Sequence, residues 1–364
     1  RTHALATSLI FDENEAGRIK GVEYLEGQAL YSADPRSSQN QLSSARKKAA
    51  FAGKEVILAG GAFNSPQLLM LSGIGDRNHL ESMGIRTRIN LPGVGKNLQD
   101  RYEVGVVTEL DGPFNILKDC TFGTQGDPCM VDYRETGKDS IYATNGVLIS
   151  IFKKSKRDYA NPDLCIFGIP GNFRGYYPGW SKDAYNKNQF SWAILKGQTK
   201  NSAGSVRLKS GSPTDTPEIN FRYFGDGSNF NGSDLDEVVE GIKYVRRVNS
   251  RARFRKMTKR ELVPGSQIKS ELDLKDFVIR EAWGHHASCS NKMGAKNDSM
   301  AVVDHEFLVR GTKNLRIVDA SVFPKIPGLF IVVPIYMISE KASDVILKSA
   351  HVHGRRRFFQ SIQF

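Results

Sequence analysis

EVILAGGAFNSPQLLMLSGIG, residues 55–75, is the stretch that decides the fold. Its apolar run Glu55–Ala59 predicts a short buried strand, and the glycines that follow at once predict a tight turn. Ser65 is a candidate N-cap for the next helix, with Pro66 at the first helical position, where no N–H is needed. Glycines at a strand-to-helix turn let the backbone approach a ligand closely, and the helix N-terminus favours an anionic group, although the residues alone favour a purely structural turn.

A second stretch, residues 281–341, combines reactive side chains with a strand, a turn and a helix start. It opens with WGHH at residues 283–286, and LRIVDAS follows as a predicted strand. A Pro/Gly turn then leads through FIVV into a helix that begins near Pro334. This order predicts that a base and the positive end of a helix dipole both act on one bound group.

The composition is that of a globular chain. Its 364 residues, 40% of them hydrophobic, allow one large or two moderate cores. No apolar run reaches the roughly eighteen residues of a membrane span. The net charge of +12 includes short basic runs at 153–157 and 355–357, which lack the interleaved aromatic residues of a nucleic-acid surface. We expect solvated surface and no nucleic-acid partner. The chain shows no targeting pattern at Arg1, so no localisation is predicted.

The cysteines lack the spacing of a metal site, so no metal is predicted. They are Cys120, Cys129, Cys165 and Cys289. Cys120 and Cys129 could bridge a loop in a secreted protein, but the sequence favours reduced, buried thiols.

Short strands between turn residues occupy much of the remaining chain. Residues 4–11 and 20–26 are predicted to pair, and residues 36–48 to form a loop. Between residues 102 and 279 the pattern indicates an antiparallel sheet with amphipathic helices. The predicted strands are 104–110, 146–152, 164–167, 190–195, 204–208 and 218–223, and the predicted helices begin at Ser233 or Asp234 and at the cap Ser270. The aromatic, glycine-rich segment Gly168–Trp180 is a candidate cleft wall or lid, and ordinary loop packing of its aromatic residues is the alternative.

Taken together, these stretches resemble the glucose-methanol-choline (GMC) oxidoreductase family. Residues 60–75 are similar to the second signature of that family, and LPGVGKNLQD, residues 91–100, is similar to the stretch that follows it. WGHHASCSNKMG, VVD, LRIVDASVFP and EKASDVI match later stretches in the same order. The run HASCSNKMG, residues 286–294, resembles the corresponding run of choline dehydrogenases.

The resemblance implies an α/β plus α+β fold, with an incomplete, doubly wound FAD-binding domain and an antiparallel-sheet substrate domain. It places FAD-binding segments at residues 1–101 and 281–350, the substrate domain at 102–280 and a basic tail at 351–364. The implied cofactor is FAD, and the implied substrate is a small-molecule alcohol. The expected cofactor-binding residues are Ala6, Gly60, Gly61, Ala62, Ser65, Asp319, Ala320, Ile331 and Val332.

The implied activity is oxidation of an alcohol to a carbonyl, in which a hydride passes to flavin N5 while a base takes the hydroxyl proton. His286 falls on the catalytic histidine of the family, and His285 is expected to support it. The helix near Pro334 is expected to place its positive end beside the flavin N1/O2 edge. From the residues alone, a structural histidine and a strand-end Asp319 that serves as a cap are the alternatives.

One departure from the family pattern concerns the chemistry. Phe330 falls on the second catalytic position of the family, which is usually Asn or His. A phenylalanine side chain neither donates nor accepts a proton, so His285 or another residue would share the work. A GMC-like lyase or cyclase that keeps FAD in a non-redox role is therefore the alternative function.

A second departure concerns the cofactor. The GxGxxG unit, which in this family binds the adenosine diphosphate half of FAD, does not occur in the sequence. We expect that unit on an N-terminal portion of the same protein, present as a separate chain. A flavin-free, inactive fragment is the remaining alternative.

Overall fold

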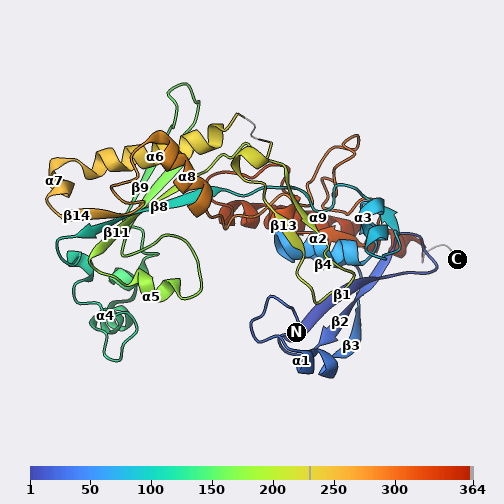
Figure 1. Ribbon diagram of the computed structural model, residues 1–364. Coiled ribbons are helices and arrows are strands. Elements are labelled where there is room, and N and C mark those ends of the chain that lie inside the picture. Colours follow the sequence, from blue (N-terminus) through green and yellow to red (C-terminus); the bar gives the residue numbers. More distant parts are fainter. Residues whose placement is uncertain (229–230, 361–364) are drawn as a thin grey trace. The chain divides into compact units, whose positions relative to one another are not determined.

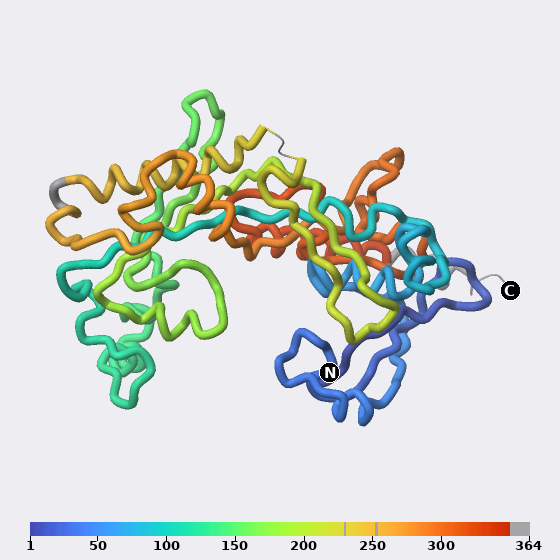
Figure 2. Tube along the Cα trace, in the orientation of Figure 1, coloured from blue at the N-terminus to red at the C-terminus, as the bar shows by residue number. Residues whose placement is uncertain are grey.

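The computed structural model describes residues 1–228 and 231–360, without the side chains of 252–253 and 350–360. The chain forms two compact units, each discontinuous in sequence. Unit 1 consists of residues 1–100, 201–222 and the chain from His286 onward, and unit 2 consists of residues 101–200 and 223–285. In Figures 1 and 2 the blue N-terminal and red C-terminal segments run together in unit 1.

Unit 1 begins with an antiparallel sheet of order β1-β2-β3. Its strands are β1 (Ala4–Phe11), β2 (Ile19–Glu26) and β3 (Arg46–Phe51). The predicted pairing of the first two strands is confirmed. The loop predicted for residues 36–48 is wrong, because it contains helix α1 (Gln39–Ser44) and the start of β3. The basic side chains of β3 pair with Glu23 and Glu26 across the sheet, and such cross-strand pairs stabilise a polar strand.

The strand–turn–helix pattern of the opening stretch is present, with a different helix start. Strand β4 (Val56–Leu58) pairs in parallel with β15 (Leu315–Ile317), and helix α2 (Gly61–Leu71) follows β4. The predicted N-cap is wrong, because Ser65 and Pro66 lie inside the helix. The predicted helix end is confirmed: Gly73 follows the helix with a φ of +81°, which glycine adopts without strain.

Pro66 is tolerated inside α2 because a distant side chain replaces its missing donor. A proline has no N–H for the carbonyl four residues before it, which here belongs to Ala62. The hydroxyl of Ser290 donates to that carbonyl oxygen at 2.5 Å. The helix therefore starts one turn earlier than its local sequence predicts.

Residues 201–222 belong to unit 1 because their strands pair with a strand of that unit. Strand β7 (Lys96–Leu98) pairs with β12 (Gly204–Arg207), which pairs with β13 (Glu218–Asn220). The predicted substrate domain, 102–280, had included these residues. The other elements of unit 1 are β5 (Ile74–Gly75), α3 (Arg77–Ser82), β6 (Ile89–Asn90) and the long helix α9 (Val332–Gln360). Their buried apolar side chains form one core, which includes Leu69, Ile74, Leu80, Val302 and Ile317.

Unit 2 is built on an antiparallel sheet of order β14-β8-β11-β10-β9. Its strands are β8 (Tyr102–Leu110), β9 (Ile149–Lys153), β10 (Leu164–Pro170), β11 (Gln189–Lys196) and β14 (Thr258–Val263). The four strands from β8 to β11 were predicted. The edge strand β14 was not, because its sequence TKRELV carries three charged residues and lacks an apolar alternation.

Helices cover this sheet as the periodicity predicts. Helix α6 (Ser233–Asn249) buries Val238, Val239, Ile242 and Val245 in the core of unit 2. Helix α8 (Glu271–Glu281) begins with a capping box in which the Ser270 hydroxyl accepts from the Asp273 N–H at 3.0 Å. The shorter helices of unit 2 are α4 (Pro128–Thr136), α5 (Trp180–Ala184) and α7 (Ala252–Arg255).

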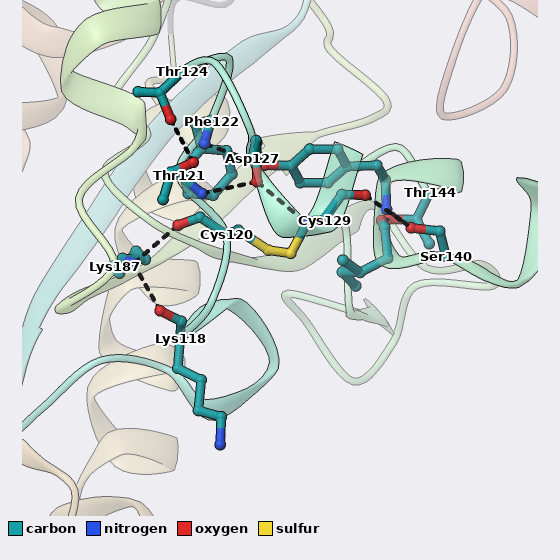
Figure 3. The surroundings of a disulfide bond; sticks show 12 residues. Lys118, Cys120, Thr121, Phe122, Thr124, Asp127, Cys129, Ser140, Thr144 and Lys187 are labelled. Carbon is teal, nitrogen blue, oxygen red and sulfur yellow. Dashed lines mark hydrogen bonds between the residues drawn. A yellow bond between two sulfur atoms is a disulfide. The ribbon is translucent and has the colours of Figure 1, made fainter. Parts of the chain in front are cut away.

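Cys120 and Cys129 form a disulfide (Figure 3), so the expectation of reduced thiols for this pair is wrong. The carboxylate of Asp127 accepts the backbone N–H groups of Thr121, Gly123 and Cys129. These bonds fold the segment back and bring the two Cα atoms of the disulfide to 5.1 Å. Cys165 and Cys289 are buried thiols, as predicted.

Two features that residues 1–228 and 231–360 lack bear on function. No helix there has the length and hydropathy needed to cross a membrane. No cluster of three or more His, Cys, Asp and Glu side chains there is arranged to hold a metal ion.

Candidate active site

A carboxylate that follows β15 holds the glycine turn between β4 and α2. One oxygen of Asp319, Oδ2, accepts the N–H of Gly61 at 2.9 Å and the hydroxyl of Ser65 at 2.6 Å. The same hydroxyl accepts the N–H of Gly60 at 3.0 Å. Gly61 has a φ of +78°, a conformation that favours glycine. Four of the predicted cofactor-binding residues are thus joined in one hydrogen-bonded network.

A cavity of about 390 Å³ lies over this turn in unit 1. Predicted cofactor-binding residues Ala6, Gly60 and Ser65 line it, together with the side chain of Tyr31. Its other walls are largely apolar and include Leu5, Val22, Val56, Ile57, Leu68 and Leu71. A backbone-lined, mostly apolar hollow with a few fixed polar groups suits a flat organic ligand.

Backbone hydrogen bonds hold the histidine-containing segment beside the residues that follow β15. The N–H of Cys289 donates to the carbonyl of Ala320 at 3.0 Å, and the N–H of Asn291 donates to that of Ser321 at 2.8 Å. Ser290, in the same segment, contacts Ala62 as described above. The predicted cofactor-binding residues Ala62 and Ala320 are both buried along this contact. Both signature stretches therefore meet inside unit 1.

His286 and Phe330, two of the three predicted catalytic residues, lie next to each other. Their ring centroids are 5.6 Å apart, with the planes at 76°. His286 is 7% exposed, and its backbone N–H donates to Asp100 Oδ1 at 2.8 Å. Phe330 is 41% exposed, so it borders the surface of unit 1. Ile331 beside it is buried, and Val332 is exposed at the first position of α9.

His285 has a different environment although it is the next residue. It belongs to unit 2, where its Nδ1 lies 3.6 Å from the buried carboxylate of Glu103. Burial lowers the pKa of His285, and the positive charge of Arg101 lowers it further. Both effects outweigh the nearby carboxylate, so the imidazole is neutral at neutral pH.

Polar side chains of residues 97–100 fix the site, and sequence reasoning assigned them no role. Asn97 donates to the carbonyls of Cys289 and Pro324, both at 3.2 Å. Gln99 Oε1 accepts the N–H of Ile326 at 3.1 Å, and Asp100 holds His286. The sequence signal for this role was the run of polar residues at the end of LPGVGKNLQD, directly before the buried strand β8. These residues position the candidate base His286 and the segments that follow it in the chain.

Comparison with known proteins assigns the family. Two models, both described as GMC oxidoreductase, match residues 1–103 and 200–339. An oxygen-dependent choline dehydrogenase of Staphylococcus epidermidis is 33% identical over 353 residues, and one of Staphylococcus xylosus is 37% identical over 301 residues. The alignments cover 95% and 80% of this chain but 55% and 50% of the relatives. The chain thus spans about half the length of the curated relatives it matches.

Solved structures share the fold. A formate oxidase variant of Aspergillus oryzae has a TM-score of 0.77 at 23% identity, covering 96% of this chain and 60% of that one. A fungal aryl-alcohol oxidase has a TM-score of 0.70 at 22% identity, covering 95% and 60%. The fold is therefore that of mixed α/β proteins with antiparallel sheets, and unit 1 contains both the cavity over the glycine turn and the buried His286. The chain belongs to the GMC oxidoreductase family.

Proposed function

We propose that the protein oxidises an alcohol to a carbonyl with FAD as cofactor. The observation that carries this proposal is that the buried His286 is held by Asp100 beside Phe330, at the start of α9. The family and the names of the choline dehydrogenase relatives support the same reaction.

The residues of unit 1 fit the cofactor. The cavity over the turn at Gly60 offers backbone and apolar walls, and the Asp319 carboxylate keeps that turn rigid. The first turn of α9 begins two residues after Phe330, so its positive end is available to a developing negative charge. Ile331 directly precedes this turn and Val332 begins it, and both would lie against the cofactor. FAD, when bound, supplies the hydride acceptor for the alcohol carbon.

In this proposal His286 accepts the hydroxyl proton of the alcohol. One C–H bond and one O–H bond of the substrate break: the hydride leaves with its electron pair for the cofactor, and the proton goes to the imidazole. The backbone bond to Asp100 orients His286, and Phe330 packs edge-on against the ring. His285 is assigned a supporting role as a second neutral imidazole. The lyase, cyclase and flavin-free alternatives are not retained, since the compared relatives are named as dehydrogenases and oxidases.

The surface of unit 1 supports the expectation of a further nucleotide-binding segment. Ile57 on β4 is exposed, and so is one end of α9 through Val333, Tyr336 and Met337. Apolar side chains of this size on a two-stranded parallel sheet and a long helix are usually covered. We propose that the unit that binds the adenosine diphosphate half of FAD packs here, completing the doubly wound sheet. The comparisons give no support to a separate chain as its source.

Anaerobic absorption spectroscopy tests this function. The purified protein should show the bands of oxidised flavin, and these should bleach when a substrate alcohol is added without oxygen. An alcohol panel covering choline, benzyl alcohol and short aliphatic alcohols serves as the screen. Flavin bands that persist with every alcohol, in a protein that binds FAD, would overturn the proposed oxidation.

A further inference from the structure

Two exposed asparagines begin the tripeptide Asn-X-Ser, in which X is not proline. Asn231 stands two residues before Ser233 in unit 2, and Asn297 stands two residues before Ser299 in unit 1. This tripeptide, the sequon, is the acceptor for N-linked glycans, and it also occurs by chance. Its structural surroundings therefore decide its meaning.

The side chain of Asn231 is held through its oxygen. Its Oδ1 accepts the backbone N–H of Ser233 at 3.1 Å, and this bond does not use Nδ2, the atom to which a glycan is joined. Asn231 is exposed, and Gly232, with a φ of +65°, leads directly into α6. A glycan on Nδ2 can therefore extend into solvent while this hydrogen bond stays in place.

The turn around Asn297 is held by the residue that follows it. The carboxylate of Asp298 pairs with Lys292 at 2.8 Å, and Arg310 donates to the backbone carbonyl of Asp298 at 2.8 Å. Asn297 and Ser299, on either side of Asp298, are both exposed. The turn can thus carry a bulky group on Asn297 without losing the bonds that shape it.

The disulfide of unit 2 is an independent indication of the compartment. The bond between Cys120 and Cys129 belongs to an oxidising environment, because disulfides form and persist in the lumen of the endoplasmic reticulum and outside the cell. N-linked glycans are attached in that same lumen. The disulfide and the two exposed sequons therefore indicate one route through the cell.

We propose that the protein is N-glycosylated at Asn231 and Asn297. The co-reactant is an oligosaccharide linked to a polyprenyl diphosphate. Nδ2 forms a bond to the first sugar carbon, the bond from that carbon to the diphosphate oxygen breaks, and the proton lost from Nδ2 goes to the diphosphate. Ser233 is buried in the folded chain, where Lys200 donates to its hydroxyl at 2.8 Å, so its sequon is modified before unit 2 folds. The proposal is independent of the proposed oxidation.

A third asparagine, Asn145, offers a matched comparison within the chain. It is exposed, Gly146 follows it, and its Oδ1 accepts the N–H of Val147 at 3.1 Å, as at Asn231. The difference lies at the position two residues on, where a valine replaces the serine. Asn145 should therefore carry no glycan in the natural protein, and Val147→Ser should add one.

Peptide mass spectrometry of the protein from its natural source tests the proposal. The peptides that contain Asn231 and Asn297 should carry a glycan, and the peptide that contains Asn145 should not. Enzymatic release of the glycans in heavy-oxygen water should leave labelled aspartate at both positions. A sample kept in the same water without the enzyme controls for spontaneous deamidation. Unmodified asparagine at either position would overturn that site, and at both positions the whole proposal.

Variants show why a site fails if it does. They are expressed from the complete coding sequence in cultured eukaryotic cells, so that the natural targeting is kept. Asn231→Gln and Ser299→Ala should each remove one glycan, whereas Ser299→Thr keeps the hydroxyl and should keep the glycan. Mobility on a denaturing gel, before and after enzymatic release, counts the glycans whether or not a variant folds.

Two results of this experiment would overturn the proposal. If Val147→Ser gains a glycan while Asn231 and Asn297 carry none, the natural sequons are chance matches. If Val147→Ser also gains none, the chain does not enter the glycosylating compartment.

Discussion

Two neighbouring histidines, His285 and His286, lie in different environments, and the proposed role of each follows from its environment. His286 is buried in unit 1 and fixed through its backbone by Asp100, whereas His285 is packed among aromatic rings in unit 2. The doublet could be found from the sequence, and the resemblance to the family distinguished its members. The residues alone could not, because both partners of His286 come from distant parts of the chain.

Replacing His286 should remove the base and little else. For His286→Ala we expect a loss of about 10²- to 10⁴-fold in kcat/KM for any alcohol that the wild type oxidises, the usual effect of removing a general base. His305→Ala changes an exposed histidine of the same unit and should leave the rate unaltered. Stopped-flow bleaching of the flavin measures both variants, and an unchanged rate in His286→Ala would remove it from the mechanism.

Phe330 offers the opposite test, because the resemblance to the family predicts a polar residue at its position. Phe330→Asn should change kcat/KM without unfolding the protein, since the side chain is 41% exposed and its burial contributes little. Thermal unfolding and alcohol turnover should be measured on the same sample. A large drop in melting temperature would show that Phe330 supports the core and that its assignment to the second catalytic position is wrong.

A third histidine, His79, should make stability depend on pH. Its ring is buried and accepts the N–H of Leu208 at 3.1 Å; burial lowers its pKa from 6.5, and Arg207 lowers it further. The unfolded chain then binds more protons than the folded one between the two pKa values. His79 thus contributes stability above pH 6.5 that is lost as the pH falls through the folded-state pKa.

Urea unfolding at pH 5 and pH 7.5 checks this sign. The free energy of unfolding of wild type should fall more steeply toward low pH than that of His79→Gln, which keeps an acceptor but does not titrate. Equal slopes for the two proteins would show that His79 is not the group responsible.

At the scale of elements, local signals were read correctly and distant ones were missed. Ser270 caps α8 as predicted, because its partner Asp273 is three residues away. Ser65 resembled a cap in the same way, yet it lies inside α2 and binds Asp319, 254 residues later. Helix-start propensity depends on residues that are close in sequence. It cannot predict a hydrogen bond to a carboxylate 254 residues away, which forms only after folding.

The start of α2 can be tested with a pair of substitutions. Ser290→Ala leaves the buried carbonyl of Ala62 without a donor and should cost about 1–3 kcal/mol in the free energy of unfolding. In a Pro66→Ala background the new N–H at residue 66 can serve that carbonyl, so the same change should cost less. A double-mutant cycle by urea unfolding measures the difference. Equal costs in both backgrounds would show that the Ser290 hydroxyl is not a substitute for the missing N–H.

At the scale of the whole molecule, residues 201–222 fall in a different unit from the residues on either side of them in the sequence. The sequence pattern located the antiparallel sheet correctly. It did not reveal that residues 201–222 return to unit 1, because strand pairing between β7 and β12 depends on contacts about a hundred residues apart. The start of α2 before Pro66 escaped prediction for the same reason, because Ser290 is distant in sequence, whereas β14 was missed because its charged sequence lacks an apolar alternation.

The disulfide should stabilise unit 2 selectively. Cys120 and Cys129 are nine residues apart in unit 2, and closing a loop of this length is worth about 2–4 kcal/mol. Replacing both with serine should lower hydrogen-exchange protection in the strands and helices of unit 2. Protection of β1, β2 and α2 in unit 1 should change little. A uniform loss across both units would show that they unfold as one cooperative body.

The turn held by Asp319 also has a consequence for biosynthesis. Ser65 leaves the ribosome 254 residues before its carboxylate partner, a delay of roughly 13 to 50 s at usual translation rates. During that interval the strands β8, β11, β10 and β9 of unit 2 are complete and can pair with one another. The turn between β4 and α2 can acquire its final form only near the end of translation. A nascent chain stalled before residue 315 should therefore contain a protease-resistant unit 2, while its first hundred residues remain sensitive to protease. Those unprotected residues are the expected binding site for a chaperone.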